Sequence, residues 1–533
     1  MPKVLGLFFS LVLGLAFVSP HVAAQQKKRA AKLPSPDKVV GEYVKALGGK
    51  NRVTSVRDAT YEWTYARGDE DEAGTVRTRT KSPASSRTDI LTPGGERSAA
   101  ANGRSAWARD AGGLPFTLTD QASLSAKLHA LLDATRFVDY KKQGVMARTV
   151  GAEEIYGKPS VVVEFSTRAG ARLRYWFNTE TKFLIRMKDD TRDLIVRYER
   201  WLPREGSPLL SEPHRLLFEE RRGREQRLLT LQSARYNEGL ADSIFDPPGD
   251  ASLDIPSLLR ELERNQGELD RRVNDYTFTR KVTQRELNDR GEVKKEKVNI
   301  YEVYPMLGPG WIQKHVSENG VPLSPERAAK EEKRVTEQML QAERNQPMHE
   351  AALAKARARR EEEERKGIAK KEDGDEVSIL TFLRACELVS PRRESFRGRE
   401  AIVFDFRPRP GFRPKSRGES IVSKLAGTVW VDPAEKHVMR LEARLVEGFK
   451  MGGGLVASVK PGAAFAFEQT RLDEGVWLPR FSQVNLSARV MLFAGMTINE
   501  TNEFSDYKRF STKAGEDKLD APKQEKPQEP VEP

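Results

Sequence analysis

The sequence predicts an α+β protein in which two antiparallel β domains follow each other along the chain. The main observation is an internal repeat, because residues 157–168 align without a gap on residues 398–409. A second matching pair follows, at residues 175–182 and 429–436. Since a long internal repeat indicates repeated structural units, two tandem domains of one fold are the economical explanation.

The first 24 residues have the pattern of a secretory signal peptide. Lys3 provides a positive start, residues 4–18 are almost wholly apolar, and residues 22–24 form a small-residue cleavage site. The apolar run is shorter than the roughly 20 residues that a membrane-spanning helix needs. We therefore expect cleavage near Ala24 and a periplasmic protein, and an uncleaved N-terminal anchor is the alternative.

The chain is basic and densely charged. Its net charge is +12 at pH 7, and 32% of its residues are charged. Such a surface favours anionic partners, although net charge alone does not identify them. In an exported protein we expect transient contact with membrane head groups and no nucleic-acid partner.

The first domain is predicted to span residues 36–250, after a polar leader at 25–35. Ser35 is a candidate N-cap, and Pro36 suits the first helical turn because its missing N–H costs nothing there. Apolar residues then recur with the spacing of one helical face. These residues are Val40, Tyr43, Val44 and Leu47.

Antiparallel strands are expected on both sides of a second helix. Short β-like runs alternate with turn signals over residues 59–108, which is typical of a meander. A leucine-rich helix is predicted over residues 119–137, and strands resume as far as Tyr236. The predicted order is therefore helix, strands, helix, strands.

The second domain is predicted over residues 251–510, opening with a helix at about 256–273. Its main departure from the first copy is a charged insertion at 324–375, dominated by Lys, Arg, Glu and Ala. This composition predicts an exposed helix or a partly disordered segment, acting as a spacer or as a lid or partner-binding arm. Residues 511–533 are rich in Lys, Glu and Pro, which predicts a disordered tail.

The repeated strands each have one bulky apolar face, because alternate strand residues point to the same side. The residues on these two faces are Val161, Val163, Phe165, Ile402, Phe404 and Phe406. The next repeated strand ends in Asn178 in the first copy and in Asp432 in the second. Both side chains can hydrogen-bond to the backbone ahead of them, so we interpret them as turn formers.

The repeated segments resemble the lipoprotein-carrier superfamily of LolA- and LolB-like proteins, in two tandem copies. The resemblance lies in a glycine before an apolar strand, then Trp-x-Asn178 or Trp-x-Asp432, then Arg186 or Arg440. It implies an incomplete β-barrel wrapped around helices, with an apolar cavity that takes acyl chains out of water. The six apolar strand residues are then candidates for the cavity lining, and a filled hydrophobic core is the alternative.

Signatures of catalysis and of metal binding are missing from the sequence. There is no His-Glu-x-x-His, Cys-x-x-Cys or Gly-x-Ser-x-Gly motif, and the six histidines are scattered. The single cysteine, Cys386, lies in an apolar stretch and is best interpreted as a small buried hydrophobic residue. We expect no enzyme activity, no catalytic residues, no metal site and no cofactor.

The leading hypothesis is an exported envelope protein that binds or carries a lipid or an acylated molecule. The alternative is a periplasmic sensor or scaffold that binds a protein partner through the same fold. In that case the insertion at 324–375 would be the contact arm.

Overall fold

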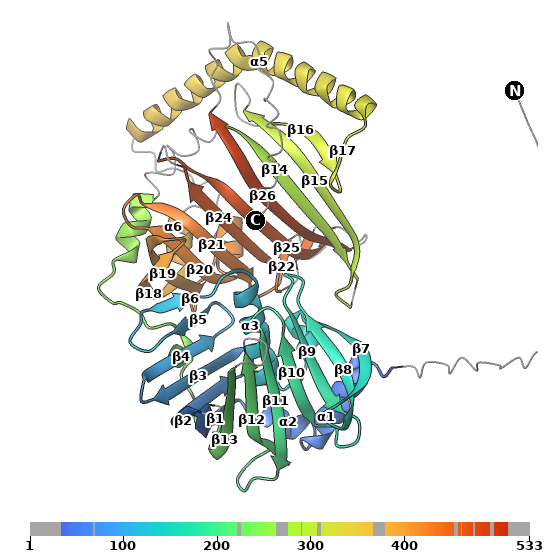
Figure 1. The fold of residues 1–533 in the computed structure, drawn as a ribbon. Helices are drawn as coiled ribbons and strands as arrows, with labels where there is room; N and C mark the ends of the chain where they lie inside the picture. The colour runs from blue at the N-terminus through green and yellow to red at the C-terminus, as the bar shows by residue number, and fades with distance from the viewer. Residues whose placement is uncertain are drawn as a thin grey trace, which may run out of the picture.

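The computed structural model describes residues 33–509, with gaps at 68–69, 221–224, 263–275, 289, 306–310, 366–378, 452–456, 460, 473–474 and 491–494. The predicted signal peptide, most of the leader and the predicted tail lie outside the described residues. Two large antiparallel sheets dominate the molecule (Figure 1). We call the elements up to Phe245 the first unit and those from residue 255 onward the second unit.

The first sheet runs in the order β6-β5-β4-β3-β2-β1-β13-β12-β11-β10-β9-β8-β7, and its edge strands β6 and β7 do not pair with each other. The sheet is therefore open. Its strands are β1 (Asp58–Arg67), β2 (Glu70–Lys81), β3 (Ser85–Thr92), β4 (Gly95–Ala101), β5 (Ala106–Arg109), β6 (Pro115–Thr117), β7 (Met146–Ile155), β8 (Lys158–Ser166), β9 (Arg172–Asn178), β10 (Leu184–Asp189), β11 (Leu194–Leu202), β12 (Glu212–Glu220) and β13 (Glu225–Tyr236).

The helices α1 (Pro36–Ala46), α2 (Lys50–Ser55) and α3 (Asp120–Thr135) and the short 3-10 helix η1 (Tyr140–Gln143) pack on one face of the first sheet. The short 3-10 helix η2 (Asp242–Phe245) lies on the other face, where its backbone carbonyls accept hydrogen bonds from Arg87 and Trp107. The predicted cap of α1 is confirmed, because the Ser35 side chain accepts a hydrogen bond from the Lys38 backbone N–H at 3.3 Å. A single large core joins α1 and α3 to the sheet, with α3 residues Leu128 and Leu132 almost fully buried.

The second sheet is also open, and runs in the order β17-β16-β15-β14-β26-β25-β24-β21-β20-β19-β18 with the β22-β23 ribbon attached to β25. Its strands are β14 (Tyr276–Leu287), β15 (Val293–Pro305), β16 (Trp311–Glu318), β17 (Val321–Pro322), β18 (Cys386–Phe396), β19 (Arg399–Pro408), β20 (Leu425–Asp432), β21 (His437–Leu445), β22 (Phe449–Met451), β23 (Ala457–Val459), β24 (Ala464–Arg471), β25 (Trp477–Val490) and β26 (Gly495–Arg509). Residues 255–262 are helical, and α6 (Ile379–Ala385) and α7 (Arg417–Val422) pack with them on β18 to β21. Two incomplete antiparallel barrels wrapped on helices are the fold class that the sequence predicts.

The sequence repeat occupies equivalent places in the two sheets. Strands β8-β9-β10 lie next to edge strand β7, and β19-β20-β21 lie next to edge strand β18. The predicted turns are confirmed: Asn178 Oδ1 accepts from the backbone N–H of Glu180 (2.8 Å) and Thr181 (2.7 Å). In the same way, Asp432 Oδ1 accepts hydrogen bonds from the backbone N–H groups of Ala434 and Glu435, both at 2.9 Å.

The charged insertion contains one long helix, α5 (Pro325–Arg365). Figure 1 shows α5 at the end of the second unit that is remote from the first unit. Its first half packs on β16 through the buried Val335 and Ala342, whereas Leu340 and Met348 are exposed. No helix within the described ranges is both long enough and apolar enough to span a bilayer.

The two units meet through buried polar contacts on the face of the second sheet that is opposite its own helices. Ser105 Oγ of the first unit donates to Asp405 Oδ2 at 2.5 Å, and the Thr117 hydroxyl donates to Glu394 Oε1 at 2.6 Å. Asp120, at the start of α3, pairs with Arg440 at 2.8 Å. These contacts place α3 directly against the second sheet.

Candidate ligand-binding site

A cavity of about 1020 Å³ lies where the two units meet. The first unit contributes the start of α1, one side of α3, η1, β7 and the β8–β9 turn. The second unit contributes the β14–β15 turn, residues 461–464 and side chains of β21 and β25. The cavity therefore opens beside the core of the first half-barrel and is bounded by the second.

One wall of the cavity is apolar and belongs to α3. Leu124, Leu128 and Leu131 recur at i, i+4 and i+7, so they project from one side of the helix toward the cavity. Val145 and Met146, at the start of β7, continue the same wall. A pocket with an apolar wall of this kind can shield a hydrocarbon chain from water, at about 0.8 kcal/mol for each buried methylene group.

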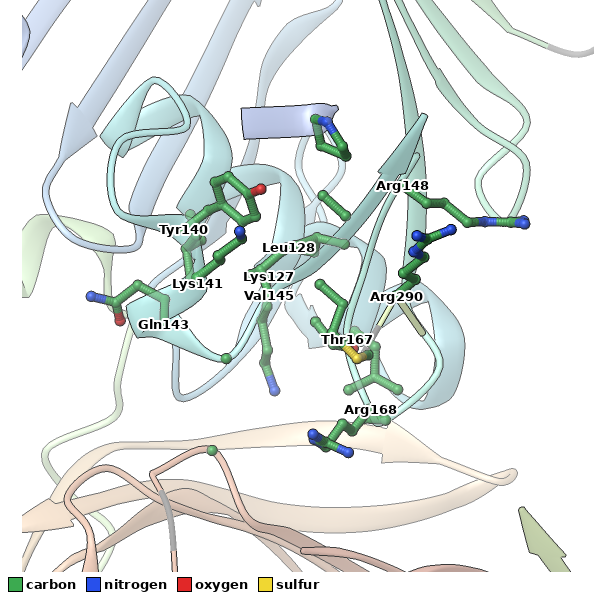
Figure 2. Close-up of a pocket in the computed structure, with 18 of the residues that line it drawn as sticks. Lys127, Leu128, Tyr140, Lys141, Gln143, Val145, Arg148, Thr167, Arg168 and Arg290 are labelled. Carbon is green, nitrogen blue, oxygen red and sulfur yellow. The ribbon is translucent and has the colours of Figure 1, made fainter. Parts of the chain in front are cut away.

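The remaining walls are strongly basic. The lining contains six cationic side chains and only two carboxylates, Asp37 and Glu292. The cations are Lys127, Lys141, Arg148, Arg168, Arg290 and Arg444. Figure 2 shows Lys127 and Arg168 on the side of the cavity that faces the strands of the second sheet.

Two of these cations form ion pairs with the two carboxylates. Lys141 pairs with Asp37, and Arg148 pairs with Glu292 at 3.2 Å and with Glu164 at 2.9 Å. Hydrogen bonds from Lys141 and then from Tyr140 hold the pKa of Asp37 below its usual value. The carboxylates near this end of the cavity are therefore ionised and already occupied.

The cations next to the second sheet are poorly matched by anions. The nearest carboxylate to Lys127 is Glu442, at 3.6 Å, and burial lowers the pKa of Lys127 despite this partner. Burial, and next the charge of Arg104, lowers the pKa of Arg444. The site thus combines an apolar wall with cations in a poorly solvated position, which is the arrangement that a molecule with an acyl chain and an anionic group would fit.

The six strand residues proposed from the sequence lie in the hydrophobic cores. Val161, Val163 and Phe165 are 7%, 0% and 0% exposed in the core of the first unit. Ile402, Phe404 and Phe406 are 8%, 0% and 1% exposed in the second. The structure brings each set of three together, and neither set lines the cavity described above. Their role in ligand binding stays a prediction.

Sequence reasoning missed the residues that do line the cavity. The only signal for Lys127 was a single cation within the leucine-rich side of a helix. Arg444 gave no signal, because it belongs to an alternating polar face of β21 that has the pattern of a solvent-exposed surface.

The described residues contain no cluster of three or more His, Cys, Asp or Glu side chains placed to hold a metal ion. Cys386 is fully buried, as its sequence context predicts, and burial raises the pKa of its thiol to about 12. A thiol with such a pKa is not a useful nucleophile at neutral pH.

No protein-family model matches the chain, and no curated protein matches it. Among solved structures, the chain is similar to LolA-like folds. A DUF1329 family protein from Desulfovibrio piger is 14% identical with a TM-score of 0.28, over 39% of this chain and 96% of that one. A LolA superfamily protein from Nitrosomonas europaea is 18% identical with a TM-score of 0.26, over 38% of this chain and 96% of that one.

A third similar structure is the MucA/MucB complex of Pseudomonas aeruginosa. It is 8% identical with a TM-score of 0.17, over 89% of this chain and 99% of the matched chain. At these identities and scores, the similarities concern the fold and carry no argument about ligands or partners.

Proposed function

We propose that this chain is an exported bacterial envelope protein that binds a lipid or an acylated molecule without chemical conversion. The observation that carries the proposal is the cavity between the units, in which the Leu124, Leu128 and Leu131 side chains face a basic wall. Its volume of about 1020 Å³ is at the upper end of the range for small-molecule sites, which suits an acyl chain.

The proposal includes two structural domains, at residues 36–250 and 251–510. The distribution of strands supports these boundaries, because β1 to β13 end at Tyr236 and the second sheet begins at Tyr276. It also includes export to the periplasm with cleavage near Ala24, supported by the N-terminal sequence pattern.

A cavity-filling variant tests the proposed binding site. Leu131→Trp places a larger side chain in the cavity and should weaken binding of the fluorescent apolar probe N-phenylnaphthylamine by about tenfold or more. Leu114→Trp is the matched control, because Leu114 is 74% exposed and does not line the cavity. Equal probe affinity in the wild type and in both variants would argue against this cavity as the site.

A protein partner is the second candidate function, and α5 favours it. Leu340 and Met348 are 47% and 70% exposed on this helix, on the part that extends beyond the buried Val335. Leu340→Glu combined with Met348→Glu should abolish capture of a partner while leaving probe binding in the cavity unchanged. Loss of probe binding instead would indicate that α5 acts on the cavity.

A further inference from the structure

Arg444 is a partly buried cation for which the described residues provide no ion-pair partner. Its Nε atom is inaccessible to solvent and has no hydrogen-bond partner in the part of the chain that the structure describes. The guanidinium lies so close to Gly103 of the first unit that a Cβ added there would be 2.8 Å from Nη2. Burial lowers the pKa of Arg444, and the neighbouring charge of Arg104 lowers it further.

The same strand shows what a satisfied arginine requires. Arg440 lies four residues before Arg444, on the same face of β21, and is 2% exposed. It pairs with Glu468, with Glu442 at 2.8 Å and with Asp120 at 2.8 Å. A buried cation without such partners is costly, because it loses its hydration and gains nothing in return. Among the described residues no carboxylate forms an ion pair with Arg444, so the desolvation of its charge is uncompensated there.

A second unsatisfied polar group lies at the same place. Asn485 of β25 is 3% exposed, and its Oδ1 atom has no hydrogen-bond partner among the described residues. Arg444, Asn485 and Lys127 all line both the main cavity and a smaller adjoining one of about 350 Å³. Leu124 also lines both, so the apolar wall reaches this polar group of residues.

We propose that Arg444, Lys127 and Asn485 bind the anionic phosphate or carboxylate head group of an amphiphile whose hydrocarbon chain lies along the α3 leucines. Arginine presents a planar set of donors that matches such oxyanions, and lysine adds a point charge. The unpaired Asn485 Oδ1 atom can accept a hydrogen bond from a hydroxyl of the head group, such as a protonated phosphate oxygen. This inference rests on the proposed function and names its ligand class. It gives the second unit a direct part in binding, since Arg444 and Asn485 belong to that unit.

Calorimetric titration of the full-length exported chain with three probes tests the inference. The probes are dodecyl phosphate, dodecanol and inorganic phosphate, with the two amphiphiles kept below aggregation. Dodecyl phosphate should bind most tightly. Arg444→Met should weaken its binding about tenfold or more, as expected for the loss of charged hydrogen bonds, and leave dodecanol affinity unchanged. Arg413→Met is the matched control and should leave dodecyl phosphate affinity unchanged, because Arg413 is exposed and lines neither cavity.

Each other result has a definite meaning. If dodecanol binds as tightly as dodecyl phosphate, or if Arg444→Met leaves dodecyl phosphate affinity unchanged, the head-group inference is wrong while the apolar cavity stands. If inorganic phosphate binds as tightly as dodecyl phosphate, the anion site exists but the hydrocarbon chain of the probe contributes nothing to its affinity. That result would overturn the proposed function. If none of the three probes binds, both proposals are overturned.

Discussion

Replacing Arg440 of β21 should lower the stability of the protein, whereas replacing Arg444 of the same strand should not. Arg440 and Arg444 share one face of the strand, but Arg440 has three carboxylate partners and Arg444 has none among the described residues. Removing one partner of a buried ion pair typically costs about 3–5 kcal/mol, because the other charge stays buried without compensation. Removing an unpaired buried cation instead removes the desolvation penalty of its charge, which does not destabilise the folded state.

The expected magnitude follows from the partners that remain. After Arg440→Met, Glu468 keeps Arg397 at 3.2 Å and also Arg480, and Glu442 keeps Lys127 at 3.6 Å. Arg440→Met should therefore lower the free energy of unfolding by about 3 kcal/mol, the lower limit of the range for breaking a buried ion pair. For a domain of 150–250 residues this corresponds to a fall of roughly 6–12 °C in melting temperature. Arg444→Met should leave the free energy of unfolding unchanged or raise it by about 1 kcal/mol or more.

Thermal and urea unfolding of the delipidated protein, followed by circular dichroism and tryptophan fluorescence, measures this difference. Addition of dodecyl phosphate at about 100 times its dissociation constant should then stabilise the wild type by about 2.7 kcal/mol. The same concentration should stabilise the Arg444→Met variant much less. A loss of stability on Arg444→Met as large as that on Arg440→Met would refute the reasoning, because it would show that Arg444 is a structural residue with a partner in the folded state.

Two further predictions concern the rest of the fold. Burial, and next the charge of Arg192, lowers the pKa of His129 to about 3, whereas its value in the unfolded state is near 6.5. Because the unfolded state binds the proton more readily, the contribution of His129 to stability should be complete above pH 6.5 and should fall between pH 6.5 and 3 by at most about 1.4 kcal/mol per pH unit. Urea titrations at several pH values should show a smaller slope for His129→Gln. Thr117→Val removes the hydroxyl that donates to Glu394 and accepts from Arg392 at 2.5 Å. The contact between the units should weaken by about 1–3 kcal/mol, and amide hydrogen exchange should accelerate at β6 and β18. Unchanged exchange in these strands would contradict the role given to the contacts.

Local sequence patterns were sufficient for much of the fold. The repeated strands, the turns at Asn178 and Asp432 and the Ser35 cap depend on neighbouring residues, so their geometry could be predicted from spacing alone. The insertion at 324–375 was ambiguous, since Ala, Glu, Lys and Arg favour helices and also occur in disordered segments. Helix α5 forms over most of it and is fixed at its start by packing on β16.

The cavity could not be predicted in this way. Bulky apolar residues at alternate positions of β8 and β19 indicate a buried apolar face, but this pattern does not distinguish a filled core from a cavity lining. The polar face of β21 has the pattern of a surface and becomes buried only because α3 of the other unit packs against it. A site built from two units that are more than 300 residues apart in the sequence, such as Lys127 with Arg444, leaves no periodic signal in either unit.

Native mass spectrometry of the full chain purified from an exported preparation, followed by organic extraction of the bound material, tests the central claim most directly. We expect an adduct with the mass of an anionic amphiphile that is lost on denaturation. It should be reduced in Leu131→Trp and retained in Leu114→Trp. A wild-type chain with a clean apoprotein mass, which also takes up no amphiphile when dodecyl phosphate is added, would contradict the account.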